Sequence, residues 1–259
     1  MKVKELMAKE IIYVDKDVDL KHVLDLMKKH DVTKIPVLED KKIIGIATDN
    51  LIAYKLGSIR KRGISTSRLH ASSVTEKKIK TISPTDDVKD ILKMVGKPGP
   101  TMLPVVDKDK LVGVLTKADI LPLVKSKKPL SILMQKNVIV VSPDDRIIHA
   151  RRIMIDENVA RLPVVNQGML AGIISDIEIA FAFASLKRSF SLGRQKHQLD
   201  ELLVKDVMRP HVIWTTQSVT AADAAKIMIK HNVGALPVLE GDTLIGIVSR
   251  TDLLKTVSL

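Results

Sequence analysis

The chain has 259 residues, of which 45% are hydrophobic and 28% charged, which is the composition of a folded protein rather than a disordered one. At roughly 150 residues per domain, this length favours two structural units. No apolar run reaches the roughly 18 residues of a spanning helix, and residues 1–5 lead into a charged segment, unlike a secretory signal. We therefore expect a cytoplasmic protein. The absence of cysteine excludes disulfides, and the formal charge of +12 favours an anionic partner.

One sequence pattern recurs four times along the chain. Four prolines each follow Ile or Leu and precede Val, and nine residues after each proline stands a glycine with apolar neighbours. Three residues after each glycine comes a threonine or serine. The positions are Pro36, Gly45 and Thr48; Pro104, Gly113 and Thr116; Pro163, Gly172 and Ser175; and Pro237, Gly246 and Ser249. This fixed spacing indicates four internal repeats of about 55–60 residues.

Each repeat has the same predicted elements in the same order. A short apolar run, such as 11–14 or 138–141, predicts a strand. A helix follows, because apolar residues recur at i, i+3, i+4 and i+7 within 20–27, although Arg151 interrupts this face in the third repeat. Two further apolar runs predict an antiparallel hairpin, and the glycine in its second strand marks a close approach of another part of the chain. A second helix begins after the hydroxyl residue, so the fold class is α/β (α+β).

The repeat resembles the CBS domain. The resemblance rests on the Leu-Pro-Val segment, the nine-residue step to glycine, and Gly-Ile-Val-Ser followed by an acid, and it covers nearly the whole chain. It implies four CBS domains at 1–57, 70–125, 126–185 and 200–259, which form two pseudo-twofold Bateman modules at 1–125 and 126–259. Four-copy members of the family include the gamma subunit of AMP-activated kinase and free-standing archaeal proteins. The resemblance also implies that AMP, ADP, ATP or S-adenosylmethionine binds between paired domains and regulates a partner.

A column of acidic residues implies which clefts bind a nucleotide. In the family, the acid three residues after the hydroxyl holds the ribose, because a carboxylate can accept from two hydroxyls at once. In this chain the column reads Leu51, Asp119, Glu178 and Asp252. Leu51 cannot accept a hydrogen bond, and the longer side chain of Glu178 changes the geometry. Asp119 and Asp252 match the family.

A second column, two residues before the proline, implies where phosphate binds. It reads Lys34, Met102, Arg161 and Ala235. Within each module, the cation of the first domain should serve the cleft whose Asp lies in the second domain. Lys34 is then expected beside Asp119, and Arg161 beside Asp252. The two columns thus select the same two clefts.

The same matching supplies the other expected nucleotide-binding residues. Hydroxyls or small side chains beside the acids, and apolar cover for the adenine, are expected from Thr116, Ala118, Val114, Val32, Thr33, Ser249, Thr251, Ile247, Val159 and Ala160. Lys117 and Arg250 are open to either a phosphate contact or a structural role. A bland alternative also exists for the acids, because an Asp at the start of a helix is often only an N-cap.

The surplus of positive charge lies in the connections between repeats. No acid occurs within 50–75, 120–143 or 179–199. This charge could raise the potential around the clefts, grip RNA or DNA phosphates, or simply form a solvated surface. The connections 58–73 and 183–199 are also candidates for docking to a protein or for self-association into a homodimer.

The leading hypothesis is a non-catalytic regulatory protein that binds AMP, ADP or ATP and signals to an unidentified protein. A nucleic-acid-binding protein is the second hypothesis, although aromatic residues make up only 2% of the chain and offer little base stacking. An S-adenosylmethionine sensor is the third. No phosphate-loop, zinc-protease or nucleophile-elbow motif occurs, so we expect neither an enzyme nor a bound metal or cofactor.

Overall fold

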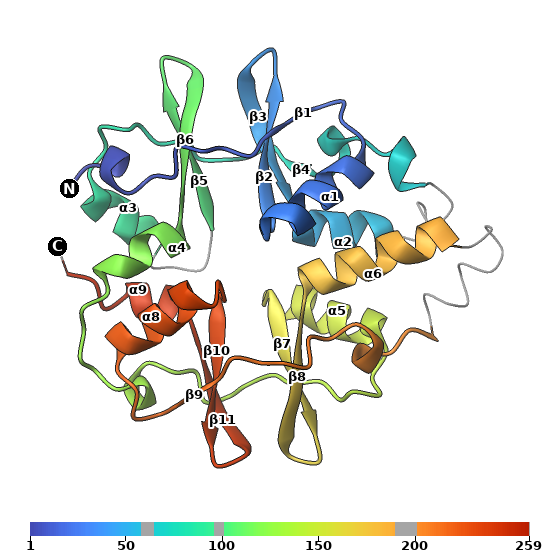
Figure 1. Ribbon diagram of the computed structural model, residues 1–259, viewed down its shortest axis with the longest axis vertical. Coiled ribbons are helices and arrows are strands. Elements are labelled where there is room, and N and C mark those ends of the chain that lie inside the picture. Colours follow the sequence, from blue (N-terminus) through green and yellow to red (C-terminus); the bar gives the residue numbers. More distant parts are fainter. Residues whose placement is uncertain (58–64, 96–100, 190–200, 259) are drawn as a thin grey trace.

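The computed structural model describes residues 1–57, 65–95, 101–189 and 201–258, without the side chains of 187–189. Four similar α/β units occupy the four quarters of a flattened molecule (Figure 1). The first two units form one half of it and the last two the other half. The predicted fourfold repeat and its mixed α/β class are confirmed.

The first half contains units one and two. Unit one comprises η1 (Val3–Glu5), β1 (Val14–Asp15), α1 (Leu20–His30), β2 (Lys34–Glu39), β3 (Lys42–Thr48) and α2 (Asp49–Gly57). Unit two comprises η3 (Thr66–Arg68), η4 (Ala71–Val74), β4 (Thr75–Glu76), α3 (Val88–Val95), β5 (Met102–Asp107), β6 (Lys110–Thr116), α4 (Lys117–Ile120) and η5 (Leu121–Leu123).

The second half repeats this order in units three and four. Unit three comprises η6 (Leu130–Ile132), α5 (Ile147–Asp156), β7 (Arg161–Asn166), β8 (Met169–Ser175) and α6 (Asp176–Ser189). Unit four comprises η7 (Val204–Asp206), β9 (Thr215–Thr216), α8 (Ala221–Lys230), β10 (Ala235–Glu240), β11 (Thr243–Ser249) and α9 (Arg250–Leu254).

The predicted hairpin is present in all four units and has one register. In the first, Pro36 lies opposite Ile46, the residue after the glycine, and the other three hairpins align in the same way. The strands are ordered β1-β2-β3-β4 in one sheet, β7-β8-β11-β10-β9 in a second and β5-β6 in a third. The strands predicted upstream of the first helix are shorter than expected. β1 retains only Val14 and Asp15, and in the third unit Val141 forms a single bridge to Val164.

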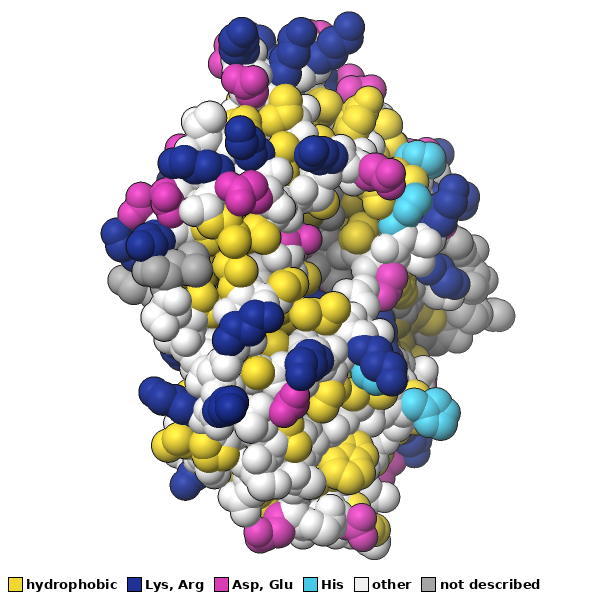
Figure 2. Space-filling view, turned by 60° about the vertical axis from the view of Figure 1, so that its left-hand side comes forward, with side chains coloured by type: hydrophobic (Ala, Val, Ile, Leu, Met, Phe, Trp, Pro, Cys, Tyr) yellow, Lys and Arg dark blue, Asp and Glu magenta, His cyan; other side chains and the backbone are white. Residues whose placement is uncertain are grey.

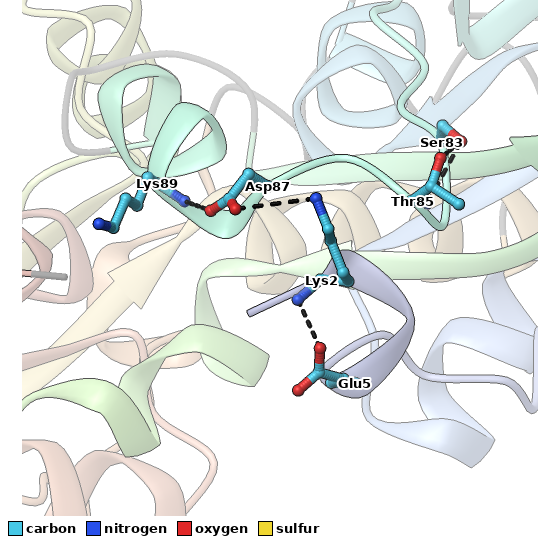
Figure 3. Close-up of polar contacts among 6 residues, drawn as sticks. All are labelled: Lys2, Glu5, Ser83, Thr85, Asp87 and Lys89. Atoms are coloured by element: carbon cyan, nitrogen blue, oxygen red, sulfur yellow. Dashed lines mark hydrogen bonds and ion pairs between the residues drawn. The ribbon is translucent and has the colours of Figure 1, made fainter.

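The units of each half exchange their first turns. The turn η1 leaves its own unit and packs on the second one, where Val3 N donates to Asp86 O (3.1 Å) and Lys2 Nζ lies 3.8 Å from Asp87 Oδ2. Figure 3 shows the contact between Lys2 and Asp87, with Asp87 also accepting from Lys89 N at 3.0 Å. In return, Ala71 N of η4 donates to a carbonyl of the first unit. The turns η6 and η7 make the same exchange in the other half.

The glycine of each hairpin lies against a residue from the paired unit, as its position in a strand predicted. A Cβ on Gly113 would lie only 2.7 Å from Met7 Sδ. Equivalent contacts, at 2.6 Å, join Gly172 to Met208 Sδ and Gly246 to Met134 Sδ, and Thr75 takes the methionine's place at Gly45. Because a side chain there would clash with the partner, the glycines allow the paired units to approach closely.

The two halves are joined through their helices. One buried core combines units one and three, where α2 packs on α6. The other combines units two and four, where α4 packs on α9. The predicted apolar face of α1 is buried in the first of these cores. No helix in the described ranges is both long and apolar enough to cross a membrane.

The arginine that interrupts the apolar face of the first helix of unit three is partly buried. The Nε and Nη2 atoms of Arg151 are buried and find no hydrogen-bond partner among the described residues. Its guanidinium lies 5.6 Å from the centre of the Tyr54 ring. Of the connections considered for docking, 58–64 and 190–200 lie outside the described residues. Residues 66–74 fold as η3 and η4, and Leu69 joins the core.

Candidate functional site

The acidic column of the sequence lies in a capping motif that recurs at the start of the second helix of the units. Asp119 Oδ2 accepts from the backbone nitrogen and the hydroxyl of Thr116, both at 2.7 Å. Asp252 makes the same bonds to Ser249 at 3.0 and 2.6 Å, and Glu178 makes them to Ser175. These acids are therefore not N-caps themselves. Each is the third helical residue of a capping box, which fixes one carboxylate oxygen and orients the other.

The second carboxylate oxygen distinguishes the three acids. Asp252 Oδ1 lies 3.0 Å from Lys255 Nζ, one turn along the same helix. Glu178 Oε1 accepts from Arg209 Nε at 2.5 Å. For Asp119 Oδ1, no hydrogen bond or ion pair comes from any residue that the structure describes. Of the three, Asp119 is thus the carboxylate with an acceptor available to a ligand.

The cationic column lies at the start of the first hairpin strand. Lys34 Nζ forms an ion pair with Asp49 Oδ1 at 3.4 Å, across its own hairpin. Arg161 extends along the backbone of the fourth unit, where a Cβ on Gly234 would lie 2.7 Å from its Nη1. Burial lowers the pKa of the Arg161 guanidinium, but an arginine remains charged at any physiological pH.

The partner of Lys34 belongs to a pair of buried acids between the two halves. Asp49 begins α2 and Asp176 begins α6, and both are at least 92% buried. Asn50 Nδ2 donates to Asp176 Oδ2 at 3.4 Å. Burial and the charge of Asp49 raise the pKa of Asp176 to about 6, against an attraction from Arg151 and Lys34. The acid pair therefore places negative charge beside the cationic column.

A single cavity of about 370 Å³ is bounded by all four units. Its first part lies between units one and two, where Val32, Thr33, Lys34, Thr116 and Ala118 line it. Its second part lies between units three and four and includes Glu178, Arg209 and His211. Arg161 of unit three and Arg250 of unit four also line it.

The cavity brings together some of the predicted nucleotide-binding residues. Six of them line it: Val32, Thr33, Lys34, Thr116, Ala118 and Arg161. Eight do not: Asp119, Val114, Asp252, Ser249, Thr251, Ile247, Val159 and Ala160. Asp119 nevertheless lies close by, because it is hydrogen-bonded to the cavity residue Thr116. Its charge also partly offsets the lowering of the pKa of Arg250, another cavity residue.

The second predicted cleft has its polar groups engaged within the protein. Lys117, which comes from the first half of the molecule, donates to Thr251 Oγ1 at 2.7 Å. Asp252 pairs with Lys255, as described above, and Arg161 lies against Gly234 rather than within hydrogen-bond distance of Asp252. The structure therefore brings Lys34 and Thr116 to one cavity and does not do so for Arg161 and Asp252.

Arg209 is a cavity residue that the family matching did not select, whereas Arg250, which the sequence left open to a phosphate contact or a structural role, also lines the cavity. Burial and the charge of Arg161 lower the pKa of Arg250, and both arginines line the cavity. The sequence contained a signal for Arg209, because it directly follows Met208, and Met7, Met134 and Met208 stand at the same position of their repeats. Among the described residues, no cluster of three His, Asp or Glu side chains could hold a metal ion.

Comparison with known proteins identifies the family of this arrangement of paired repeats. The family model described as "CBS domain" matches residues 3–56, 71–126, 130–185 and 204–259. The chain therefore belongs to the CBS domain family, and it contains four of these domains.

Among its relatives are two uncharacterised proteins of Methanocaldococcus jannaschii. MJ1404 is 26% identical over 99% of this chain, which spans 62% of the length of MJ1404. MJ1225 is 22% identical and matches 95% of each chain. The crystal structure of MJ1225, a protein proposed as an archaeal homologue of g-AMPK, aligns over 100% of both chains with a TM-score of 0.86 at 21% identity. The domain pair of CBSX2, solved in complex with AMP, aligns with 49% of this chain at 24% identity and a TM-score of 0.41.

Proposed function

We propose that this chain is a regulatory protein that binds an adenine nucleotide between its first two CBS domains. The observation that carries the proposal is the environment of Asp119. Thr116 fixes one carboxylate oxygen, and the other is not engaged by any described residue. A carboxylate held in this way can accept hydrogen bonds from both hydroxyls of a ribose, as the family resemblance implies.

The cavity next to Asp119 suits the phosphate end of such a ligand. Lys34, Arg161 and Arg250 all line it, and the two arginines are partly removed from water. Cations in such surroundings attract phosphate more strongly than they would at an exposed surface. Val32 and Val114, on the facing units, are the proposed apolar cover for the adenine.

A second, weaker site is proposed in the other half of the molecule, around Asp252. Ser249, Thr251, Ile247, Val159, Ala160 and Arg161 would form it with Asp252. A ribose there must displace Lys255 from Asp252 Oδ1, and a phosphate must draw Arg161 away from Gly234. Both changes cost free energy, so we expect this site to fill after the Asp119 site.

The proposed role of the ligand is regulation without catalysis. Residues of all four domains line the cavity. A nucleotide in it would therefore contact both halves of the molecule. If it binds one relative arrangement of the halves more tightly, it shifts the population toward that arrangement. A separate protein would sense this shift.

Calorimetric titration with AMP, ADP and ATP tests the proposal. Asp119→Asn keeps an acceptor for the Thr116 cap but loses the carboxylate, and Lys34→Met removes a cation. Losing one charged hydrogen bond of roughly 1.5–3 kcal/mol should weaken binding about 10- to 150-fold. Asp156→Asn, an exposed acid of α5 paired with Arg152, is the matched control and should bind as the unmodified chain does. Unchanged affinity in Asp119→Asn would contradict the proposal.

The same titration separates the two other hypotheses. If S-adenosylmethionine binds and AMP, ADP and ATP do not, the chain is better described as an S-adenosylmethionine sensor. A short RNA that binds with steep salt dependence and survives Asp119→Asn would favour a nucleic-acid-binding protein. Figure 2 shows one face of the molecule, on which Lys and Arg side chains stand singly or in small groups with acidic side chains among them. A continuous basic stripe, which phosphate backbones require, is not seen on that face.

A further inference from the structure

The cleft between units three and four has space for a ligand, but its carboxylate is already bound within the protein. Glu178, Ser175 and Ile173 of unit three line the cavity together with Arg209 and Val233 of unit four. Arg209 Nε donates to Glu178 Oε1 at 2.5 Å, while Ser175 holds Oε2. Both oxygens of Glu178 are therefore engaged, in contrast to those of Asp119.

Arg209 occupies a position that recurs in every repeat. Its backbone pairs with Ile173, the residue after the hairpin glycine of the adjoining unit. The corresponding pairs are Ala8 with Val114, Glu76 with Ile46, and Gln135 with Ile247. We call this set of positions the facing column. Each of its residues lies against the unit that carries one member of the acidic column: Ala8 against that of Asp119, Gln135 against that of Asp252, Arg209 against that of Glu178 and Glu76 against that of Leu51.

The burial of the two partners explains why the ion pair forms. The Glu178 side chain is only 10% exposed, whereas that of Arg209 is 56% exposed. A carboxylate removed from water needs a hydrogen-bonded partner, because leaving it unpaired is unfavourable. The longer side chain of Glu178 carries its second oxygen to the guanidinium. Ala8, by contrast, has no polar group to offer Asp119.

We propose that Arg209 determines ligand specificity by closing the Glu178 cleft to the ribose of a nucleotide. This inference rests on the proposed function of the Asp119 cleft. A ribose diol would have to replace a charge-assisted hydrogen bond with neutral ones, which are about half as strong. The facing column therefore decides which carboxylates accept a nucleotide: Ala8 leaves Asp119 available, and Arg209 occupies Glu178.

The first test measures nucleotide binding after the two other sites have been disabled. In the full chain carrying Asp119→Asn and Asp252→Asn, we expect little binding of AMP in equilibrium dialysis. Adding Arg209→Ala should create one new site, with an affinity at least about tenfold higher than that of the double variant. Adding Glu178→Gln to that triple variant should abolish the new site. Arg209→Lys in place of Arg209→Ala should keep the cleft closed, because the cation remains.

The reverse experiment uses the otherwise unmodified chain. Ala8→Arg should lower AMP affinity at the Asp119 cleft about tenfold or more, whereas Ala8→Leu, which adds bulk without charge, should lower it less. Thermal unfolding of each variant establishes that it is folded, and the Ala8 variants keep the inference testable if Arg209→Ala does not fold.

The outcomes separate this inference from the proposed function. If the unmodified chain binds AMP and Asp119→Asn does not, the proposed function stands. The inference then fails if Arg209→Ala creates no site and Ala8→Arg has no larger effect than Ala8→Leu. It also fails if AMP occupies the Glu178 cleft of the unmodified chain. If no variant binds any adenosine derivative, both ideas fail together.

Discussion

The two contacts that join the halves of the molecule differ in length and in charge. On one side α2 packs along α6, which has 14 residues, and the ring of Phe183 lies against Gly57. On the other side α4 and α9, which have four and five residues, meet over a shorter stretch. The residue after the hydroxyl is Asp49 and Asp176 on the first side, and Lys117 and Arg250 on the second. Equivalent positions thus bring two acids together at one contact and place two cations at the other.

This difference shows what repetition fixes and what it leaves free. The hairpin register recurs in all four units because it follows from backbone geometry. The capping box recurs in the three units that have an acid at its third helical position. The residue that follows the hydroxyl has no such constraint, so its charge can differ between repeats and make different contacts. The acid pair holds Lys34 in place beside the cavity, whereas Lys117 crosses to Thr251.

The largest expected effect concerns the long contact. Phe183 is 1% exposed, so Phe183→Ala should lower the free energy of unfolding by about 3–5 kcal/mol. Leu254→Ala removes a buried side chain of α9 on the short contact. It should cost about 2–3 kcal/mol, because a leucine leaves a smaller cavity than a phenylalanine does. Urea unfolding measures both. A larger loss for Leu254→Ala would mean that the short contact holds the halves together.

The acid pair should make stability depend on pH. The pKa of Asp176 is raised from 3.8 to about 6, so the folded chain binds a proton more tightly than the unfolded chain. The contribution of Asp176 to the free energy of unfolding should fall as pH rises from about 4 to 6 and stay low above that. The whole change is roughly 3 kcal/mol at most. Asp176→Asn lacks this fall and should be the more stable protein at pH 7.

Unfolding free energies measured between pH 4 and 8 check this prediction. Asp156→Asn, which changes an exposed acid, serves as the control and should follow the unmodified chain. Asp49→Asn sharpens the comparison, because removing the neighbouring charge should lower the pKa of Asp176 and shift the fall toward acid. Parallel curves for Asp176→Asn and the unmodified chain would show that the acid pair does not control stability.

Much of the fold could be predicted from the sequence because the same pattern occurs at the same spacing in all four repeats. The register of four prolines and glycines gave the hairpins, and the glycine position correctly predicted a close approach at Gly113. The sequence could not show that Met7 makes this approach, since that requires knowing how units pair in space. The short first strands were overestimated, because the apolar residues of 138–140 have β propensity but make no ladder hydrogen bonds.

The candidate site was predicted less completely than the fold. Matching the repeats by position selected Lys34 and Thr116, and both line one cavity. Their selection required only their positions within the repeat. It did not indicate Arg209 or the ion pairs of Asp252 and Glu178. Those contacts depend on side chains that differ between repeats, so no repeated pattern announces them. The contact of the Arg151 guanidinium with the ring of Tyr54, which belongs to a different unit, could not be predicted for the same reason.

The smallest expected effect lies on the short contact, at Lys117. This side chain is 5% exposed and donates to Thr251, and burial lowers its pKa from 10.5. Because the folded chain releases this proton more readily than the unfolded chain, its stability should rise with pH on approaching 10.5. Lys117→Met should lack that rise. At pH 7 it should change the unfolding free energy by no more than about 1 kcal/mol, because the lost hydrogen bond offsets the relief of burying a charge. Unfolding at pH 7 and at alkaline pH, with exposed Lys125→Met as control, measures both effects. A loss of several kcal/mol at pH 7 would instead make Lys117 a principal link between the halves.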